Sequence, residues 1–307
     1  MRAFIFPGQG SQAVGMGKAL AEASRVAREL FQEVDEALGQ NLARLMAEGP
    51  QDELTLTENA QPAIMANALA TLRTAGIDLG SKASFVAGHS LGEYTALAAA
   101  ESFDVATTAR LLKLRGRSMQ AAVPVGQGAM AALIGVDLEI AQSIAEEAAQ
   151  GEICTAANDN APGQVVVSGH KAAVERAIAV AKERGFKRAL LLPVSAPFHS
   201  PLMEPAAHAM EQALGDTDIR PPLVPVYANV TAAPVEEPAE IRRLLVEQVT
   251  GMVRWRESVI AMADAGVTHF VEFGGKVLGP MVKRIVPDAA TTSVVTMDDI
   301  DALVKEV

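Results

Sequence analysis

Apolar and polar positions along this chain follow two different periods, and each period predicts its own kind of element. The stretch Arg2–Phe6 is short and mostly apolar, which is typical of a buried strand, and it ends at the loop Pro7–Gly10. From Ser11 to about Leu38 the apolar residues recur with a helical period. Next come a predicted helix at 60–75, a strand at 83–88 and helices at 91–100 and 105–119. This alternation predicts an α/β fold.

The order of the predicted elements changes in the middle of the chain. A strand at 128–136 and a helix at 138–150 precede strands at 153–157 and 164–168, a helix at 171–185 and a strand at 187–194. The segment Asn158–Gly163, between the two adjacent strands, has the composition of a turn. Because this is the element order of the ferredoxin-like split unit, we predict a small inserted subdomain at residues 125–195.

The α/β pattern resumes after this insertion. Strands are predicted near 223–229, 268–273 and 292–296, with helices between them. We therefore predict that residues 1–124 and 196–307 form one discontinuous α/β subdomain. The 307 residues, half of them apolar, are enough for one large domain or two smaller ones.

Composition argues against several classes of function. The formal net charge of −11 argues against a nucleic-acid partner, whose phosphates require a basic face. No apolar run is long enough to span a bilayer, and the N-terminal run stops at Pro7, so we expect no membrane contact and a cytoplasmic location. The single Cys154 cannot form an internal disulfide, and five scattered histidines give no metal-site spacing.

The segment Gly88–Gly92 (GHSLG) matches the pattern G-x-S-x-G, which predicts that Ser90 is a nucleophile. Such a serine sits on a sharp turn from a strand into a helix, where small neighbours allow the turn and helix N-terminal amides face the developing oxyanion. The strand predicted before Gly88 and the helix predicted after it supply this context. The alternative is a chance match in a chain with 24 glycines.

A nucleophilic serine needs a base, and His199 is the best candidate. It lies in a loop, and Ser200 and Pro201 resemble the N-cap and first position of a helix, whose positive end favours a neutral imidazole. Of the other histidines, His89 adjoins the serine and His170 lies at the edge of the small subdomain. His208 falls in a predicted helix and His269 in a predicted strand. No aspartate between serine and histidine has a compelling setting (Asp104, Asp137, Asp159), so a backbone carbonyl is an alternative orienting group.

Seven ordered segments resemble malonyl-CoA:acyl carrier protein transacylases, a family that also occurs as acyltransferase domains of fatty acid and polyketide synthases. These segments are Phe4–Gln12, Gln61–Ala63, Gly88–Tyr94, Arg115–Gln120, Asn158–Val166, Pro197–Met203 and Gln248–Trp255. Together they cover essentially the whole chain, and the resemblance implies an α/β-hydrolase-like large subdomain. The block Glu272–Leu278 departs from the family because it lacks a residue that many relatives carry between its two glycines.

The resemblance implies catalytic roles for five residues. Ser90 would attack the malonyl thioester, and His199 would take its proton. The backbone amides of Gln9 and Leu91 would form the oxyanion hole, and the main-chain carbonyl of Gln248 would orient the imidazole.

The resemblance also implies substrate contacts. Arg115 would pair with the free carboxylate of malonyl, which a planar guanidinium binds in a bidentate way. Acetyl-CoA would leave that arginine unpaired. Gln61, Asn158 and Asn160 would contact acyl or pantetheine groups. An aromatic residue at Phe198 goes with malonyl in this family, because it would crowd the α-methyl group of methylmalonyl, although simple core packing would also explain it.

The implied reaction is a ping-pong transfer through a malonyl-serine ester, with malonyl-CoA and acyl carrier protein as partners and no cofactor or metal. We expect a monomer that supplies fatty acid biosynthesis. Carrier proteins are acidic, so docking on this acidic chain requires a local basic patch. The candidates are Lys182, Arg184, Lys187 and Arg188, for which ordinary solvated surface is the alternative.

Two other functions share parts of this pattern. A serine hydrolase such as a thioesterase would use Ser90 and His199, but more than a hundred residues follow this histidine, whereas in α/β-hydrolases it usually lies near the C-terminus. Arg115 would then have no task. A non-catalytic subunit that binds carrier protein would be expected to have lost the serine, histidine or arginine.

Overall fold

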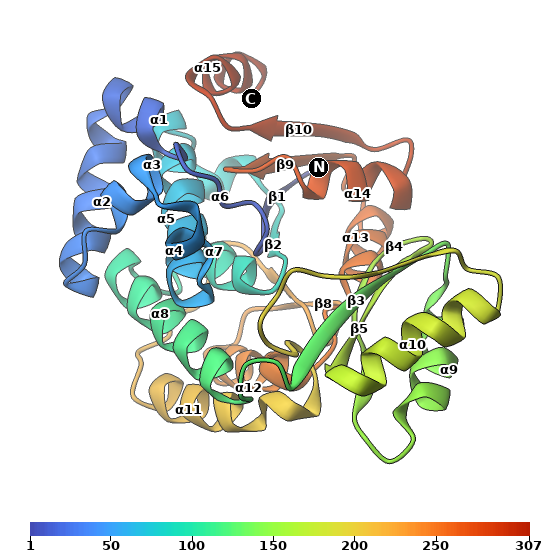
Figure 1. Cartoon of the computed structure of the whole chain (residues 1–307). Coiled ribbons are helices and arrows are strands. Elements are labelled where there is room, and N and C mark those ends of the chain that lie inside the picture. The colour runs from blue at the N-terminus through green and yellow to red at the C-terminus, as the bar shows by residue number, and fades with distance from the viewer.

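The computed structural model describes residues 1–307 (Figure 1). Six strands form its large sheet. Their order is β10-β9-β1-β2-β7-β8, and every pair is parallel except β7 with β8. The strands are β1 (Arg2–Phe6), β2 (Phe85–Gly88), β7 (Val226–Ala228), β8 (Ala233–Val235), β9 (His269–Phe273) and β10 (Ala290–Val294). The α/β fold predicted from the sequence is confirmed.

Helices cover both faces of the large sheet, because successive side chains of a strand point to opposite faces. In β1, Phe4 and Phe6 belong to one core, and Ala3 and Ile5 belong to the other. The first core contains residues of α1 (Lys18–Ala23), α2 (Arg25–Leu38), α3 (Leu42–Glu48), α4 (Gln51–Thr55), α5 (Thr57–Ala75), α6 (Leu79–Lys82), α7 (Leu91–Ala99), α8 (Val105–Ala121), α11 (Glu204–Gly215), α12 (Pro238–Thr250) and α15 (Met297–Glu306). The second core is formed with α13 (Trp255–Asp264) and α14 (Leu278–Ile285).

A second, four-stranded sheet has the order β4-β5-β3-β6 and is antiparallel throughout. Its elements are β3 (Gly128–Ile134), α9 (Leu138–Ala149), β4 (Cys154–Ala161), β5 (Gln164–His170), α10 (Lys171–Glu183) and β6 (Arg188–Leu191), in the element order of the ferredoxin-like unit. The helices α9 and α10 pack on its outer face with a separate core (Figure 1). The boundaries at 125 and 195 fall in the connections that flank β3 and β6, and they stay a prediction.

The helix predicted to start at Ser11 is wrong in its first part. The chain is irregular up to Gly17, because Gly15 and Gly17 adopt φ values of 98° and 75°, in the left-handed region. The remainder is split at Ser24, which is extended and whose hydroxyl accepts a hydrogen bond from the backbone N–H of Ala27. Two glycines and a capping serine therefore override a continuous apolar period.

The turn predicted at Asn158–Gly163 is also wrong in its extent. The strand β4 continues through Ala161, and only Pro162 and Gly163 separate it from β5. Two register shifts mark irregularities in the pairing of β4 with β5. On its other side, β4 pairs with Val253, whose N–H donates to the carbonyl of Ala157 and whose carbonyl accepts from the N–H of Asp159. Pairing on both sides holds turn-forming residues in an extended strand.

An ion pair with a buried carboxylate also joins the small sheet to α13 at this point. Asp159 is 1% exposed, and its carboxylate accepts hydrogen bonds from Arg256 of α13 at 2.8 to 3.1 Å. Since alternate residues of a strand point in opposite directions, Asn158 and Asn160 face the other way, into the cavity described below. None of the helices combines the length and the apolar character that spanning a bilayer requires.

Candidate active site

Ser90 occupies the sharp turn between β2 and α7. Its φ of 54° and ψ of −113° lie in a sparsely populated region, which costs about 1–3 kcal/mol and is common at functional sites. The flanking glycines are required by close packing. A Cβ on Gly88 would lie 1.8 Å from the carbonyl oxygen of Gly92, and a Cβ on Gly92 would lie 2.3 Å from that of Phe6. The G-x-S-x-G motif therefore has the local geometry that the sequence predicted.

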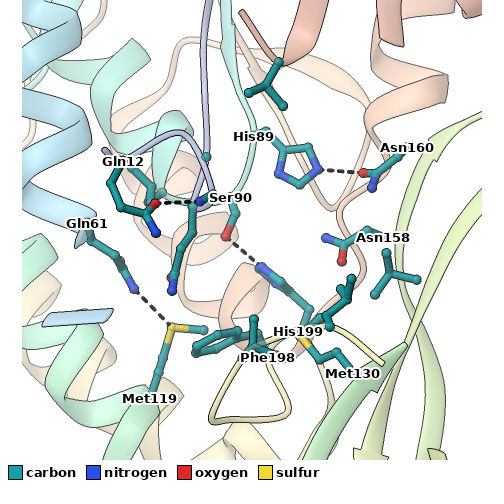
Figure 2. Close-up of a pocket in the computed structure, with 18 of the residues that line it drawn as sticks. Gln12, Gln61, His89, Ser90, Met119, Met130, Asn158, Asn160, Phe198 and His199 are labelled. Atoms are coloured by element: carbon teal, nitrogen blue, oxygen red, sulfur yellow. Dashed lines mark hydrogen bonds between the residues drawn. The ribbon is translucent and has the colours of Figure 1, made fainter. Parts of the chain in front are cut away.

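His199 is the side chain that meets this serine. Its Nε2 lies 2.7 Å from Ser90 Oγ (Figure 2). Its Nδ1 lies 2.9 Å from the carbonyl oxygen of Gln248 and 3.1 Å from that of Gly251. Because carbonyl oxygens only accept, Nδ1 must carry the proton, which leaves Nε2 free to accept the serine proton. Burial and the nearby charge of Arg115 lower the pKa of His199 to about 3, so the imidazole is neutral.

The helix start predicted after His199 differs from the structure. Ser200 and Pro201 begin only a short 3-10 turn, η1 (Pro201–Met203), before α11 starts at Glu204. The Ser200 hydroxyl caps no N–H and donates instead to the carbonyl of Pro197. The lowered pKa of the imidazole therefore comes from its burial and from Arg115.

Arg115 extends from α8 to the serine and is 1% exposed. It donates from Nη2 to Ser90 Oγ at 3.1 Å and to the side-chain oxygen of Gln248 at 2.8 Å, and from Nη1 to the side-chain oxygen of Gln61 at 2.7 Å. All of its hydrogen-bond acceptors are neutral side chains, and its Nε is buried without a partner. A buried guanidinium whose only acceptors are neutral is suited to an incoming anion.

A polar cluster that the sequence analysis missed lies beneath the serine. Asn229, after β7, donates from its side chain to the carbonyl of Gly88 at 2.7 Å and accepts from the N–H of Ser90 at 2.8 Å. Glu93 accepts from the N–H of Asn229 at 3.1 Å and from the side-chain amide of Gln248 at 2.7 Å. The only signal in the sequence was the position of Glu93, one residue after the G-x-S-x-G motif.

The two predicted oxyanion donors are available in the structure. The backbone N–H groups of Gln9 and Leu91 make no hydrogen bond with the rest of the chain. Both residues line the same cavity as Ser90. The N–H of Leu91 belongs to the first turn of α7, whose positive end favours a developing negative charge. The side chain of Gln9 is held by the hydroxyl of Thr57 at 3.0 Å.

A cavity of about 450 Å³ connects these groups, and it is lined by loops and helices of the large subdomain and by strands of the small sheet. All ten predicted site residues except Gln248 line it; Gln248 lies beneath it with no exposed surface. Figure 2 shows His89 pointing to Asn160, and their Nε2 and Oδ1 atoms are 2.7 Å apart. Asn158 and Phe198 also border this space. Sequence reasoning missed the apolar lining that includes Met119, Met130, Val166 and Leu192.

The remaining titratable candidates lie elsewhere. Asp104 caps α8, and Asp137 precedes α9. His170 accepts from the N–H of Ile153, His208 is exposed beside Glu204, and His269 contacts Thr292. No group of three or more histidine, cysteine or acidic side chains is placed to hold a metal ion. Gly274, in the shortened loop, packs against α5, and a Cβ there would lie 2.7 Å from Ala68 Cα.

Comparison with known proteins gives one consistent result. A family model described as the acyl transferase domain matches residues 3–277. The malonyl CoA-acyl carrier protein transacylase of Bacillus subtilis is 46% identical over 285 residues, which is 92% of this chain and 90% of the relative. The enzyme of that name from Escherichia coli K12 is 46% identical over 292 residues, or 95% and 94% of the two chains.

Solved structures agree with this result. The acyl-carrier-protein S-malonyltransferase from Bartonella henselae has a TM-score of 0.97 and 50% identity, with 99% of this chain and 98% of that chain covered. A malonyl-transacylase in complex with its type II PKS acyl-carrier protein has a TM-score of 0.97 and 41% identity, with 100% and 99% covered.

Proposed function

This chain belongs to the acyl transferase domain family, and from that premise we propose how its residues move a malonyl group from malonyl-CoA to acyl carrier protein. The chain is an acyltransferase, and its relatives bear the name malonyl CoA-acyl carrier protein transacylase. The observation that carries the substrate assignment is Arg115. It is a buried guanidinium 3.1 Å from the nucleophile with no carboxylate partner of its own.

The first half-reaction acylates Ser90. The hydroxyl attacks the thioester carbonyl while its proton passes to Nε2 of His199, 2.7 Å away. The N–H groups of Gln9 and Leu91 stabilise the oxyanion of the tetrahedral intermediate. When that intermediate collapses, the carbon–sulfur bond breaks, and His199 returns the proton to the departing coenzyme A thiolate.

The second half-reaction uses the same groups in reverse. The pantetheine thiol of the carrier protein gives its proton to His199 and attacks the malonyl-serine ester. The Ser90–acyl bond then breaks, and the proton on His199 returns to the serine oxygen. The Nδ1 proton stays on the imidazole throughout, because the carbonyls of Gln248 and Gly251 hold it.

Arg115 accounts for the choice of malonyl over acetyl groups. The malonyl carboxylate replaces neutral acceptors of the guanidinium with a charge-assisted pair. An acetyl group has no carboxylate, so the guanidinium keeps its neutral acceptors. About 1–3 kcal/mol of transition-state stabilisation is then lost relative to malonyl. Phe198 borders the cavity and crowds larger, branched acyl groups, while Gln61, Asn158 and Asn160 contact the acyl and pantetheine parts.

Intact mass spectrometry tests this proposal. Purified protein is mixed with malonyl-CoA or acetyl-CoA without acceptor, beside the Ser90→Ala variant. We expect a malonyl adduct on the native chain, little acetyl adduct, none on the variant, and loss of the adduct when holo carrier protein is added. Release of free malonate without a lasting adduct would instead identify a hydrolase.

An acidic carrier protein requires a basic surface on this enzyme for docking. Lys182, Lys187 and Arg188 are exposed and form no ion pair, whereas Arg184 pairs with Glu147. Lys187 and Arg188, adjacent at the start of the edge strand β6, are the better candidates for contact with an acidic carrier protein. We infer a cytoplasmic enzyme that supplies malonyl units to fatty acid biosynthesis.

A further inference from the structure

Glu93 is a buried carboxylate that the proposed reaction does not use. It is 2% exposed, in the first turn of α7, and both of its hydrogen bonds come from N–H donors, the backbone of Asn229 and the side chain of Gln248. A buried carboxylate without a charged partner is costly, so its surroundings should hold a compensating positive charge.

That positive charge is Arg115, one amide group away. The Gln248 amide receives a hydrogen bond from Arg115 on its oxygen at 2.8 Å and donates one from its nitrogen to Glu93 at 2.7 Å. The amide can satisfy both groups only in this orientation, with its oxygen toward the guanidinium. The Glu93 carboxylate, the Gln248 amide and the Arg115 guanidinium therefore form a continuous chain of hydrogen bonds that ends at Ser90 Oγ.

We propose that Glu93 is a specificity-determining positioning residue. In the empty site its negative charge balances the positive charge of Arg115. When substrate binds, the malonyl carboxylate supplies that negative charge instead. This rests on the proposed function. Once the guanidinium pairs directly with substrate, Glu93 faces a second negative charge and takes up a proton. Binding of malonyl-CoA is then linked to protonation, whereas binding of acetyl-CoA is not.

Among the titratable groups in this cluster, Glu93 is the one whose pKa lies near neutral pH. Burial raises the pKa of Glu93 to about 7. On the same side lie Arg115, which keeps its charge, and Tyr94, whose pKa is raised by burial. His199 has a pKa of about 3, and burial lowers the pKa of His89 below its ordinary value. Substrate bearing a carboxylate raises the Glu93 pKa further, so affinity for malonyl-CoA increases as pH falls.

Calorimetric titration of the Ser90→Ala variant, which binds substrate without reacting, tests this linkage. We expect affinity for malonyl-CoA to rise about three- to tenfold from about pH 8 to 6.5, while affinity for acetyl-CoA, which shares every coenzyme A phosphate, changes less. Titration in buffers of different protonation enthalpy measures the proton directly. Absence of proton uptake specific to malonyl-CoA overturns the proposal.

Adding Glu93→Gln to this variant locates the proton. Glutamine can still accept both hydrogen bonds, so the pH dependence should vanish and affinity at about pH 8 should rise by up to about tenfold. The matched control is Glu247→Gln, an exposed carboxylate next in sequence to Gln248, which should retain the full pH dependence. If the dependence persists in Glu93→Gln, the proton is elsewhere and the proposal is wrong.

Failure of the proposed function gives a different result. If Ser90→Ala binds malonyl-CoA no more tightly than acetyl-CoA at any pH, then Arg115 does not recognise the carboxylate and both proposals fall. A preference for malonyl-CoA without proton uptake overturns the role of Glu93 alone.

Discussion

The large-sheet wall of the cleft is polar and closely hydrogen-bonded, whereas the small-sheet wall is mostly apolar. Ser90, His199 and Arg115 belong to the large-sheet wall and hold one another through bonds of 2.7 to 3.1 Å. The small-sheet wall presents Met130 and Val166 from β3 and β5, with the asparagines of β4 at one side. The difference indicates that one wall carries out the chemistry, while the other encloses the acyl group and keeps water from the ester.

Breaking the polar wall should have the largest effect. The His199→Gln variant loses the base, so we expect the rate of acylation to fall about 10³- to 10⁴-fold, with the folded structure retained. Release of coenzyme A in a single turnover measures this rate. His208→Gln, at an exposed site on α11, is the matched control and should keep full activity. A His199→Gln variant within tenfold of the native rate would show that another group is the base.

Separating the two walls should have the next largest effect. The Arg256→Ala variant leaves the Asp159 carboxylate buried and unpaired, which we expect to lower the free energy of unfolding by about 3–5 kcal/mol. The KM for malonyl-CoA should rise as well, because Asn158 and Asn160 flank Asp159 on β4. Chemical denaturation measures the first effect and steady-state kinetics the second.

Arg25→Ala is the control for this second variant, since Arg25 and Glu29 form an exposed pair that should contribute less than about 0.5 kcal/mol. Equal stability of Arg256→Ala and Arg25→Ala would mean that the ion pair does not hold the walls together.

The smallest effect is expected at the exposed edge strand β6 of the small sheet. In the double variant Lys187→Glu/Arg188→Glu, the KM for carrier protein should rise several-fold at low salt, about tenfold at most, while the KM for malonyl-CoA stays the same. Lys18→Glu/Arg73→Glu changes the net charge equally at exposed sites elsewhere and serves as the control. Equal effects of the two double variants would place carrier docking elsewhere.

The residues of the polar wall could be predicted from the sequence much better than the buried polar residues beneath them. Ser90 and His199 lie in short local patterns, whereas Arg115 and Gln248 followed from family resemblance. Glu93 and Asn229 were missed because their bonds join residues more than 130 positions apart, and no local pattern marks a polar side chain that becomes buried.

The small-sheet wall was predicted in its topology but not in detail. The order of strands and helices was readable from two hydrophobic periods. The extension of β4 through Asn158 and Asn160 was not, because Val253 imposes it from a distant part of the chain. Likewise, the left-handed backbone at Gly15 and Gly17 ended a helix that periodicity alone would have continued. Tertiary pairing and backbone conformation decide these cases.

The imidazole of His199 is hydrogen-bonded to the C-terminal end of α12. The carbonyl of Gln248 that holds Nδ1 belongs to the last turn of α12, which ends at Thr250, so the imidazole fills the place of a C-terminal cap. A helix C-terminus acts as about half a negative charge, enough to stabilise an imidazolium as it forms but less than a full carboxylate. His199 therefore stays a weak base between the two half-reactions. A weak base activates water poorly, which allows the acyl-serine ester to persist until a thiol, a more acidic nucleophile, arrives.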